Sequence, residues 1–250
     1  MFSILSARYH QGHRTMKFPE GIKLPDRFRG IPQFDVAHCP KECRACVDAC
    51  PTQAIAFDGN LKVDLGRCLF CTDCQNACPE NLVTYGSDFS LSVRAREDLV
   101  VEMGQSLKLA SQLDKEMKRV LGRSLKLREV SAGGCNACEA DVNVLTTVGW
   151  DLNRFGIQFV ASPRHADGIL VTGPVSQNMK EALLKTYDAI ASPKLVIAVG
   201  ACAISGGAYQ GHAETVSGIS EILPVDLYIP GCPPHPATTL DGLVRLLGKL

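Results

Sequence analysis

Eight cysteines between Cys39 and Pro79 constrain this chain more than any other feature of its sequence. They fall into two runs of four, and each run closes with a Cys-Pro pair. Such dense and regular spacing is typical of thiolate ligands to metal. Paired zinc sites and disulfides are the alternatives, but neither requires three closely spaced thiols followed by Cys-Pro. The first run is Cys39, Cys43, Cys46 and Cys50, and the second is Cys68, Cys71, Cys74 and Cys78.

The second run has the spacing of a bacterial two-cluster ferredoxin. The first run differs by one additional residue, because Pro40-Lys41-Glu42 separates its first two cysteines. In that arrangement three thiolates of one run and the last cysteine of the other hold each 4Fe-4S cluster. The proline after each fourth cysteine stops helix continuation, so this cysteine can turn toward the neighbouring cluster. The prediction is Cys39, Cys43, Cys46 and Cys78 for cluster one, and Cys68, Cys71, Cys74 and Cys50 for cluster two.

Composition narrows the class of protein further. The 26 basic residues equal the 26 acidic ones, so the net charge of zero provides no overall field that would recruit nucleic acid. Twelve cysteines without a recognisable signal peptide predict a reducing compartment. No apolar run approaches the roughly 20 residues that a membrane helix needs. Any attachment to a membrane is therefore expected to come through a partner or a surface contact.

Four segments are predicted along the chain. Residues 1–38 contain recurrent Pro and Gly and no steady apolar period, which predicts an extended arm, either a solvated tail or a segment that lies along a partner subunit. Residues 39–93 are expected to form an α+β ferredoxin domain, with a hairpin at Asp58-Gly59 and a further strand at 82–85. Residues 94–124 have apolar spacing that suits a helical connector, with Gly122 as its stop.

From residue 125 the pattern changes to alternating strands and helices. Strands are expected at 125–130, 157–160, 168–172, 194–199 and 225–229. Helices are expected after Glu139 toward residue 148, over 175–190 and over 236–250. This alternation predicts an α/β, flavodoxin-like parallel-sheet domain over 125–250.

The four remaining cysteines each follow a predicted strand. Because doubly wound sheets bind their ligands at the carboxyl ends of the strands, these thiols are expected to meet at one edge. Four converging thiolates can hold a third 4Fe-4S cluster. Small buried hydrophobic residues and an FMN site at the same edge are the alternatives, and the FMN site would leave the cysteines unexplained. The four are Cys135, Cys138, Cys202 and Cys232.

Four motifs of the C-terminal half resemble the small subunit of membrane-bound, energy-converting NiFe hydrogenases, a family that includes formate hydrogenlyase. They are GCNACE (134–139), SPRHAD (162–167), GACAISGG (200–207) and VDLYIPGCPP (225–234). The homologous subunit of respiratory complex I is similar, but there the first two cysteines are adjacent, so the CxxC spacing here favours the hydrogenases. A departure is Ala132, where many hydrogenase relatives carry a further, non-ligand cysteine.

Residues 1–99 resemble a second subunit of those complexes, the two-cluster ferredoxin-like polypeptide. RFRGIP (27–32) and RED (96–98) extend this match beyond the cysteines. The chain therefore resembles a fusion of two neighbouring subunits, which implies three 4Fe-4S clusters in one polypeptide.

The resemblance implies an oxidoreductase subunit that relays electrons through three clusters, with the third cluster proximal to a NiFe site in a separate large subunit. All twelve cysteines are then assigned, and none is left to bind nickel. The expected partners are that large subunit, an electron donor or acceptor at the ferredoxin domain, and membrane subunits that place the chain on the cytoplasmic face. The alternative is the same module in a complex I-like oxidoreductase that lacks hydrogenase activity and reduces a quinone or another acceptor. A mobile soluble carrier would need only the ferredoxin half.

Four polar residues near these motifs are candidates for supporting roles. Glu139 is a candidate for proton movement near the third cluster, or an acid favoured by the first turn of its helix. Arg164, His165 and Asp167 are candidates for contacts behind the ligands or with a partner, and an Arg–Asp pair that braces a loop would explain them equally well.

Overall fold

Five parallel strands form the larger sheet of the computed structural model, which describes residues 2–40 and 42–250. Their spatial order, β10-β9-β8-β6-β7, is the flavodoxin-like order of a doubly wound sheet. The predicted parallel α/β sheet is thus confirmed, and each strand begins within two residues of the expected position. The strands are β6 (Leu125–Ser131), β7 (Ile157–Phe159), β8 (Gly168–Thr172), β9 (Leu195–Val199) and β10 (Leu227–Ile229).

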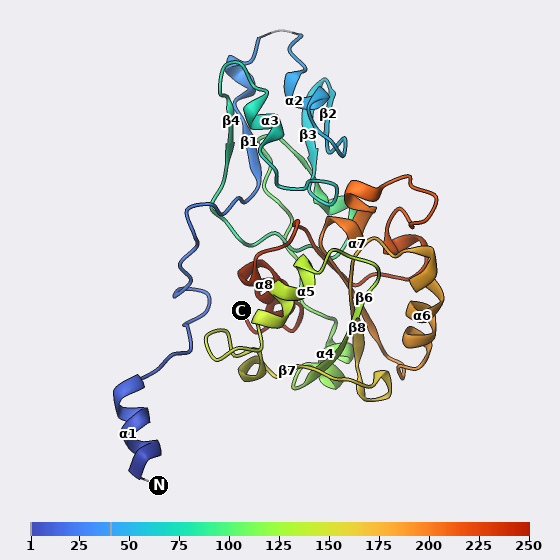
Figure 1. Cartoon of the computed structure of the whole chain (residues 1–250). Coiled ribbons are helices and arrows are strands. Elements are labelled where there is room, and N and C mark those ends of the chain that lie inside the picture. The colour runs from blue at the N-terminus through green and yellow to red at the C-terminus, as the bar shows by residue number, and fades with distance from the viewer. Residues whose placement is uncertain (1, 41) are drawn as a thin grey trace.

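Helices cover both faces of this sheet (Figure 1). Along β8, Val171 packs in a hydrophobic cluster with Leu183 of α6, whereas the preceding Leu170 packs in a second cluster with Leu243 of α8. Successive side chains of a strand point to opposite faces, so an apolar strand such as β8 supplies both clusters. The helices are α5 (Ala137–Val144), α6 (Gln177–Asp188), α7 (Ala201–Ser205) and α8 (Pro236–Leu246).

The cysteine-rich half contains two small antiparallel sheets and two one-turn helices. The hairpin predicted at Asp58-Gly59 is confirmed, with Gly59 in the left-handed region at φ +83°. The strand expected at 82–85 exists, but it pairs with a strand of the arm, and β5 completes the hairpin sheet instead. The elements are β1 (Pro32–Phe34), α2 (Ala45–Asp48), β2 (Ile55–Asp58), β3 (Asn60–Asp64), α3 (Asp73–Asn76), β4 (Val83–Tyr85) and β5 (Val100–Glu102).

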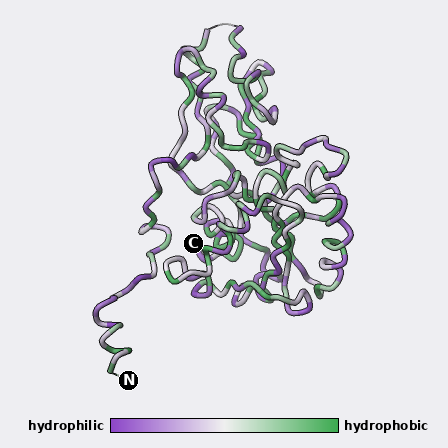
Figure 2. The backbone as a smooth tube through the Cα atoms, viewed as in Figure 1, coloured by the Kyte–Doolittle hydropathy of each residue, from purple (hydrophilic) through white to green (hydrophobic). Residues whose placement is uncertain are grey.

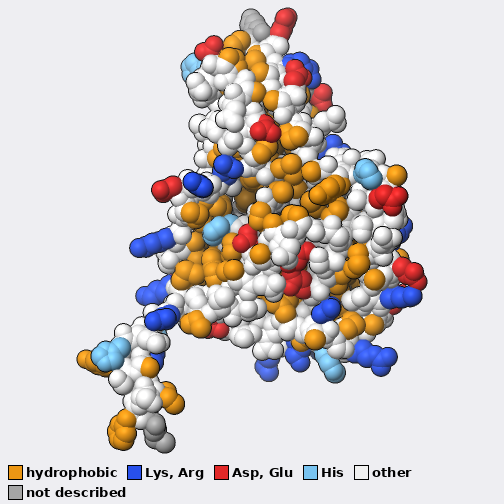
Figure 3. All heavy atoms as spheres, in the orientation of Figure 1, with side chains coloured by type: hydrophobic (Ala, Val, Ile, Leu, Met, Phe, Trp, Pro, Cys, Tyr) orange, Lys and Arg blue, Asp and Glu red, His pale blue; other side chains and the backbone are white. Residues whose placement is uncertain are grey.

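Two predictions about the remaining segments are wrong in part. The arm is not extended throughout, because α1 (Phe2–Gln11) is a helix that projects from the molecule with its apolar side chains exposed (Figures 1 and 3). The connector is α-helical only at α4 (Lys115–Leu121), which ends at the predicted Gly122. Its first part is drawn into the hairpin sheet, where Val101 pairs with Val63, so tertiary pairing overrides the helical spacing. Short 3-10 turns are η1 (Val36–His38), η2 (Arg96–Leu99), η3 (Leu152–Phe155), η4 (Pro163–His165), η5 (Gly207–Tyr209) and η6 (Ile219–Glu221).

The two halves share one continuous hydrophobic core. A single cluster of buried side chains includes Leu65 and Leu99 from the cysteine-rich half and Ile204 from the sheet half. At the same junction Val93 and Tyr228 exchange two backbone hydrogen bonds of 3.1 and 2.9 Å. Figure 2 shows hydrophobic residues along the central strands. No helix within the described ranges is both long and apolar enough to span a membrane.

Candidate metal centres

The first two cysteine quartets lie around two separate cavities. Each cavity is lined by three cysteines of one run and by the Cys-Pro cysteine of the other run. This is the crossed grouping that the spacing predicts. One cavity is lined by Cys39, Cys43, Cys46 and Cys78, and the other by Cys68, Cys71, Cys74 and Cys50.

The two runs have the same local geometry despite the additional residue in the first. The residue before the second cysteine is left-handed in both, Glu42 at φ +70° and Phe70 at φ +52°. The backbone N–H four residues after each Cys-Pro cysteine donates to its sulfur, from Ala54 to Cys50 at 3.2 Å and from Leu82 to Cys78 at 3.3 Å. Hydrogen bonds of this kind stabilise a thiolate and tune a cluster bound to it.

Burial and mutual proximity disfavour charge on these thiols. Burial, together with the neighbouring Cys50, Cys74 and Cys71, raises the pKa of Cys68 to about 12. Burial likewise raises the pKa of Cys46, followed by the proximity of Cys74 in the other quartet. A polycationic group bound in each cavity would reverse this balance, because a metal ion favours the deprotonated thiol. The donor set therefore fits a thiolate-bound iron–sulfur cluster.

The third quartet forms where the predicted edge of the parallel sheet lies. Cys135 and Cys138 follow β6, Cys202 lies in α7 after β9, and Cys232 follows β10. Burial, and then the nearby Cys232 and Cys135, raise the pKa of Cys202 to about 11. Burial also raises the pKa of Cys138, with Cys202, Cys232 and Cys135 among the further causes. The four thiols of the sequence prediction are therefore neighbours in space.

Two glycines make room for the third quartet. Gly200 has φ +88°, and a Cβ added there would lie 2.7 Å from the Cys138 sulfur. Gly207 has φ +54°, and a Cβ added there would lie 2.8 Å from the Cys202 sulfur. Only glycine combines these left-handed conformations with such close approach.

The third quartet faces the second. Burial raises the pKa of Cys232, and its further causes are Cys135 and then Cys71, a member of the second quartet. A cavity between the halves is lined both by Cys232 and by Phe70, the residue before Cys71. The Arg29 side chain of the arm donates a 3.0 Å hydrogen bond to the Phe70 carbonyl at this place. The order along the molecule is therefore first, second and third quartet.

Glu139 lies beneath the third quartet in a hydrogen-bonded site. Its side chain is 7% exposed, and it accepts hydrogen bonds from Ser131 and, at 2.7 Å, from Thr172. Burial raises the pKa of Glu139, but these two hydrogen bonds outweigh burial and hold the pKa below its ordinary value. A role in proton movement stays a prediction.

The other three polar candidates lie away from the cysteines. Arg164 and His165 form η4 and Asp167 precedes β8, so all three lie at the amino end of that strand, opposite the thiol edge. Asp167 braces the sheet by accepting a 2.7 Å hydrogen bond from the Lys126 backbone N–H, rather than by pairing with Arg164. They therefore do not support the third quartet, and a partner contact stays a prediction.

Two residues of the sites were missed by the sequence analysis. Tyr85 of β4 donates to the Cys71 carbonyl, and its hydroxyl lies 3.4 Å from the Cys74 sulfur. Glu129 of β6 lines a cavity with Glu139 and has one buried carboxylate oxygen without a hydrogen-bond partner among the described residues. Burial and then Glu139 raise the pKa of Glu129 to about 7. No signal in the sequence marks Tyr85. Glu129 could have been found, because the alternation along β6 places it on the same face as the buried Leu125 and Leu127.

Each half of the chain matches a known protein family. The family described as "NADH ubiquinone oxidoreductase, 20 Kd subunit" matches residues 135–246, and the family described as "4Fe-4S dicluster domain" matches residues 38–82. The chain is 40% identical over 135 residues to the "Probable membrane-bound hydrogenase subunit mbhJ" of Pyrococcus furiosus, which is 54% of this chain and 81% of that protein.

Two further relatives come from different complexes. "Formate hydrogenlyase subunit 7" of Escherichia coli is 39% identical over 160 residues, which is 64% of this chain and 62% of that protein. An NADH-quinone oxidoreductase subunit of Desulfovibrio desulfuricans is 43% identical over 113 residues, which is 45% of this chain and 61% of that protein.

Proposed function

The chain belongs to the family of the 20 kDa subunit of NADH–ubiquinone oxidoreductase, together with the membrane-bound hydrogenase subunit that it matches, and on this premise we propose that it is an iron–sulfur electron-transfer subunit. The observation that carries the proposal is the grouping of the twelve cysteines into three quartets, two around their own cavities and one at the carboxyl edge of the sheet. Three bound 4Fe-4S clusters would supply one-electron transfer.

The residues of the chain would hold and insulate these clusters. Cys39, Cys43, Cys46 and Cys78 are the proposed ligands of the first, Cys68, Cys71, Cys74 and Cys50 of the second, and Cys135, Cys138, Cys202 and Cys232 of the third. The cysteine-rich half would be a ferredoxin domain. Backbone N–H groups directed at the sulfurs would stabilise the reduced state of the bound groups.

We propose a large catalytic subunit of the NiFe-hydrogenase type as the partner at the third quartet. The similarity of this chain to membrane-bound hydrogenase and formate hydrogenlyase subunits favours this assignment. Membrane subunits of the same complex would place the chain on the cytoplasmic face. The second candidate is a complex I-like oxidoreductase that reduces a quinone, which the match to an NADH-quinone oxidoreductase favours.

Metal analysis of anaerobically prepared protein tests the cluster assignment. We expect about twelve iron atoms per chain and no stoichiometric zinc. About two zinc ions in place of iron in the cysteine-rich half would refute it. Purification with the large subunit, followed by assays with hydrogen and with a quinone, separates the two candidate complexes. The chain alone should accept electrons from dithionite and neither evolve nor consume hydrogen.

A further inference from the structure

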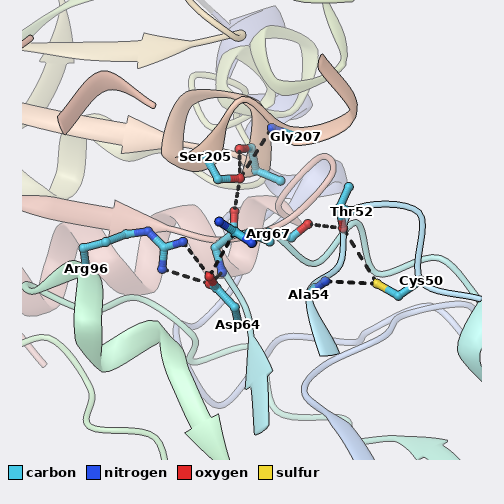
Figure 4. A network of polar contacts seen from close by, with 10 residues as sticks. Cys50, Thr52, Ala54, Asp64, Arg67, Arg96, Ser205 and Gly207 are labelled. Atoms are coloured by element: carbon cyan, nitrogen blue, oxygen red, sulfur yellow. Dashed lines mark hydrogen bonds and ion pairs between the residues drawn. The ribbon is translucent and has the colours of Figure 1, made fainter. Parts of the chain in front are cut away.

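A buried hydroxyl joins the helix that carries Cys202 to the loop that precedes Cys68 (Figure 4). Ser205 lies three residues after Cys202, at the end of α7, and is 4% exposed. Its Oγ donates toward the Gly66 carbonyl oxygen at 2.9 Å and toward the Ala201 carbonyl oxygen at 3.1 Å. Gly66 lies two residues before Cys68, so this hydrogen bond connects the immediate surroundings of the second and third quartets.

The loop at Gly66 is held firmly on its own side. Asp64 accepts two hydrogen bonds from the Arg96 guanidinium, at 2.8 and 2.7 Å, and a third from the Gly66 N–H at 2.9 Å. The Arg67 carbonyl accepts a 2.8 Å hydrogen bond from Thr52, two residues after Cys50 (Figure 4). The bidentate pair between Arg96 and Asp64 fixes the direction as well as the distance of the contact. The Gly66 carbonyl is therefore a fixed point of the second quartet's surroundings.

Close packing reinforces the same contact. A Cβ added at Gly66 would lie 2.8 Å from the Ile204 Cγ2 atom and 2.9 Å from the Arg96 Cζ atom. Gly66 is not in a left-handed conformation, so its requirement is for space rather than for backbone freedom. The loop and α7 thus meet with no room for one more methyl group.

We propose that Ser205 is a positioning residue that fixes the second quartet relative to the third, and with it the electronic coupling between clusters bound there. The inference rests on the proposed function. The step concerned is exchange of one electron, which is lost at one quartet and gained at the other, and Ser205 itself is unchanged by it. No cysteine takes part in this contact, so its loss changes the spacing between the two quartets and leaves both ligand sets in place.

Two variants perturb the contact by opposite means. Ser205→Ala removes the hydroxyl, and Gly66→Ala inserts a methyl group between the loop and Ile204. The matched control is Ser92→Ala, because Ser92 is also fully buried and also donates across the two halves, to the Thr238 carbonyl at 3.4 Å. That contact involves α8 rather than α7, so its loss leaves the contact at Gly66 intact.

The measurement is EPR of the dithionite-reduced full-length protein, with iron counted on the same samples. Two paramagnetic clusters broaden and split one another's signals in a way that falls steeply with distance. We expect the parent and Ser92→Ala to show this interaction between the second and third clusters, and both contact variants to lose or weaken it while keeping about twelve iron atoms.

Each other outcome overturns the inference. Parent-like splitting in both contact variants would mean that Ser205 does not set the spacing. An equal loss of splitting in Ser92→Ala would mean that any buried change between the halves weakens the interaction, and not specifically the contact of Ser205. Loss of iron in Ser205→Ala would make the serine part of the third site's framework rather than a positioning residue. Only about eight iron atoms in the parent would refute the proposed third cluster, and this inference with it.

Discussion

Replacing Cys202 by alanine tests the third site with the least disturbance to the other two. Cys202 is the proposed ligand contributed by α7, and no other cysteine lies between Cys138 and Cys232 in the sequence. The remaining three thiols of the quartet each have their own place after β6 and β10, so none is free to substitute. The eight proposed ligands of the other two sites all lie between residues 39 and 78.

The expected magnitude follows from the ligand count. Loss of one thiolate should remove the third cluster entirely or leave a three-iron form, so iron should fall from about twelve to about eight or eleven per chain. The first two clusters should persist, because their cavities contain no atom of Cys202. The reciprocal variant Cys46→Ala should lower the iron by the same amount from the first site and leave the third intact.

EPR of the dithionite-reduced variant, recorded beside the parent, is the assay. The third set of signals should disappear while the other two remain. In the assembled complex, electrons should still reach dyes at the cysteine-rich half but not the terminal acceptor. Unchanged spectra together with full turnover would show that Cys202 is only a core residue, and the assignment of Cys135, Cys138 and Cys232 as ligands would have to be abandoned with it.

Three further changes test the structure from other directions. Gly200→Ala should expel the third cluster, with a loss of about four iron atoms, because the added Cβ would lie 2.7 Å from the Cys138 sulfur. The control is Gly211→Ala, which should keep all iron, because Gly211 has a similar φ of +76° but nothing within 4 Å of an added Cβ. The raised pKa of Glu129 means that the folded state holds the proton more tightly than the unfolded state, so the parent should lose stability as the pH rises from 4.5 to about 7. Glu129→Gln cannot ionise and should abolish this loss. At pH 8 this variant should be more stable than the parent by roughly 1–2 kcal/mol after allowance for partial exposure, which denaturant titration at two pH values measures. Leu99→Ala should cost about 2–5 kcal/mol in the same assay, since Leu99 is fully buried in the core that both halves share.

Local patterns predicted the α/β half well. The strands β8 and β9 are buried at every position and apolar except for Thr172, which is typical of parallel strands covered on both faces. Only Gly200 separates the end of β9 from α7, so Cys202 lies at the carboxyl edge of the sheet. The crossed grouping of Cys50 and Cys78 was also predictable, because the Cys-Pro spacing repeats and each run carries its own turn.

Long-range pairing explains what could not be predicted. Residues 94–124 have helical spacing, but Val101 lies beside Val63, and no local signal marks that pairing. The contact between Ser205 and Gly66 joins positions 139 residues apart, and a serine at the end of a helix has nothing in the sequence to distinguish it. Arg164 and His165 were expected near the third quartet but lie at the opposite end of β8. Their motif shows that they are close in sequence to that strand, but not at which end of it they lie.

The exposure of the third quartet gives a physical reason for a partner at that place. Cys135 is exposed and does not line the cavity between the halves, whereas every cysteine of the first two quartets is at least partly covered. Solvent exposure is one of the factors that set the reduction potential of an iron–sulfur cluster, so the open side of the third site leaves its potential dependent on whatever covers it. Cys232, by contrast, lines the cavity between the halves and lies near Cys71 of the second quartet. With the proposed clusters bound, the contacts of the chain itself would fix the path between the second and third quartets, and the exposed side at Cys135 would be completed by the proposed catalytic subunit.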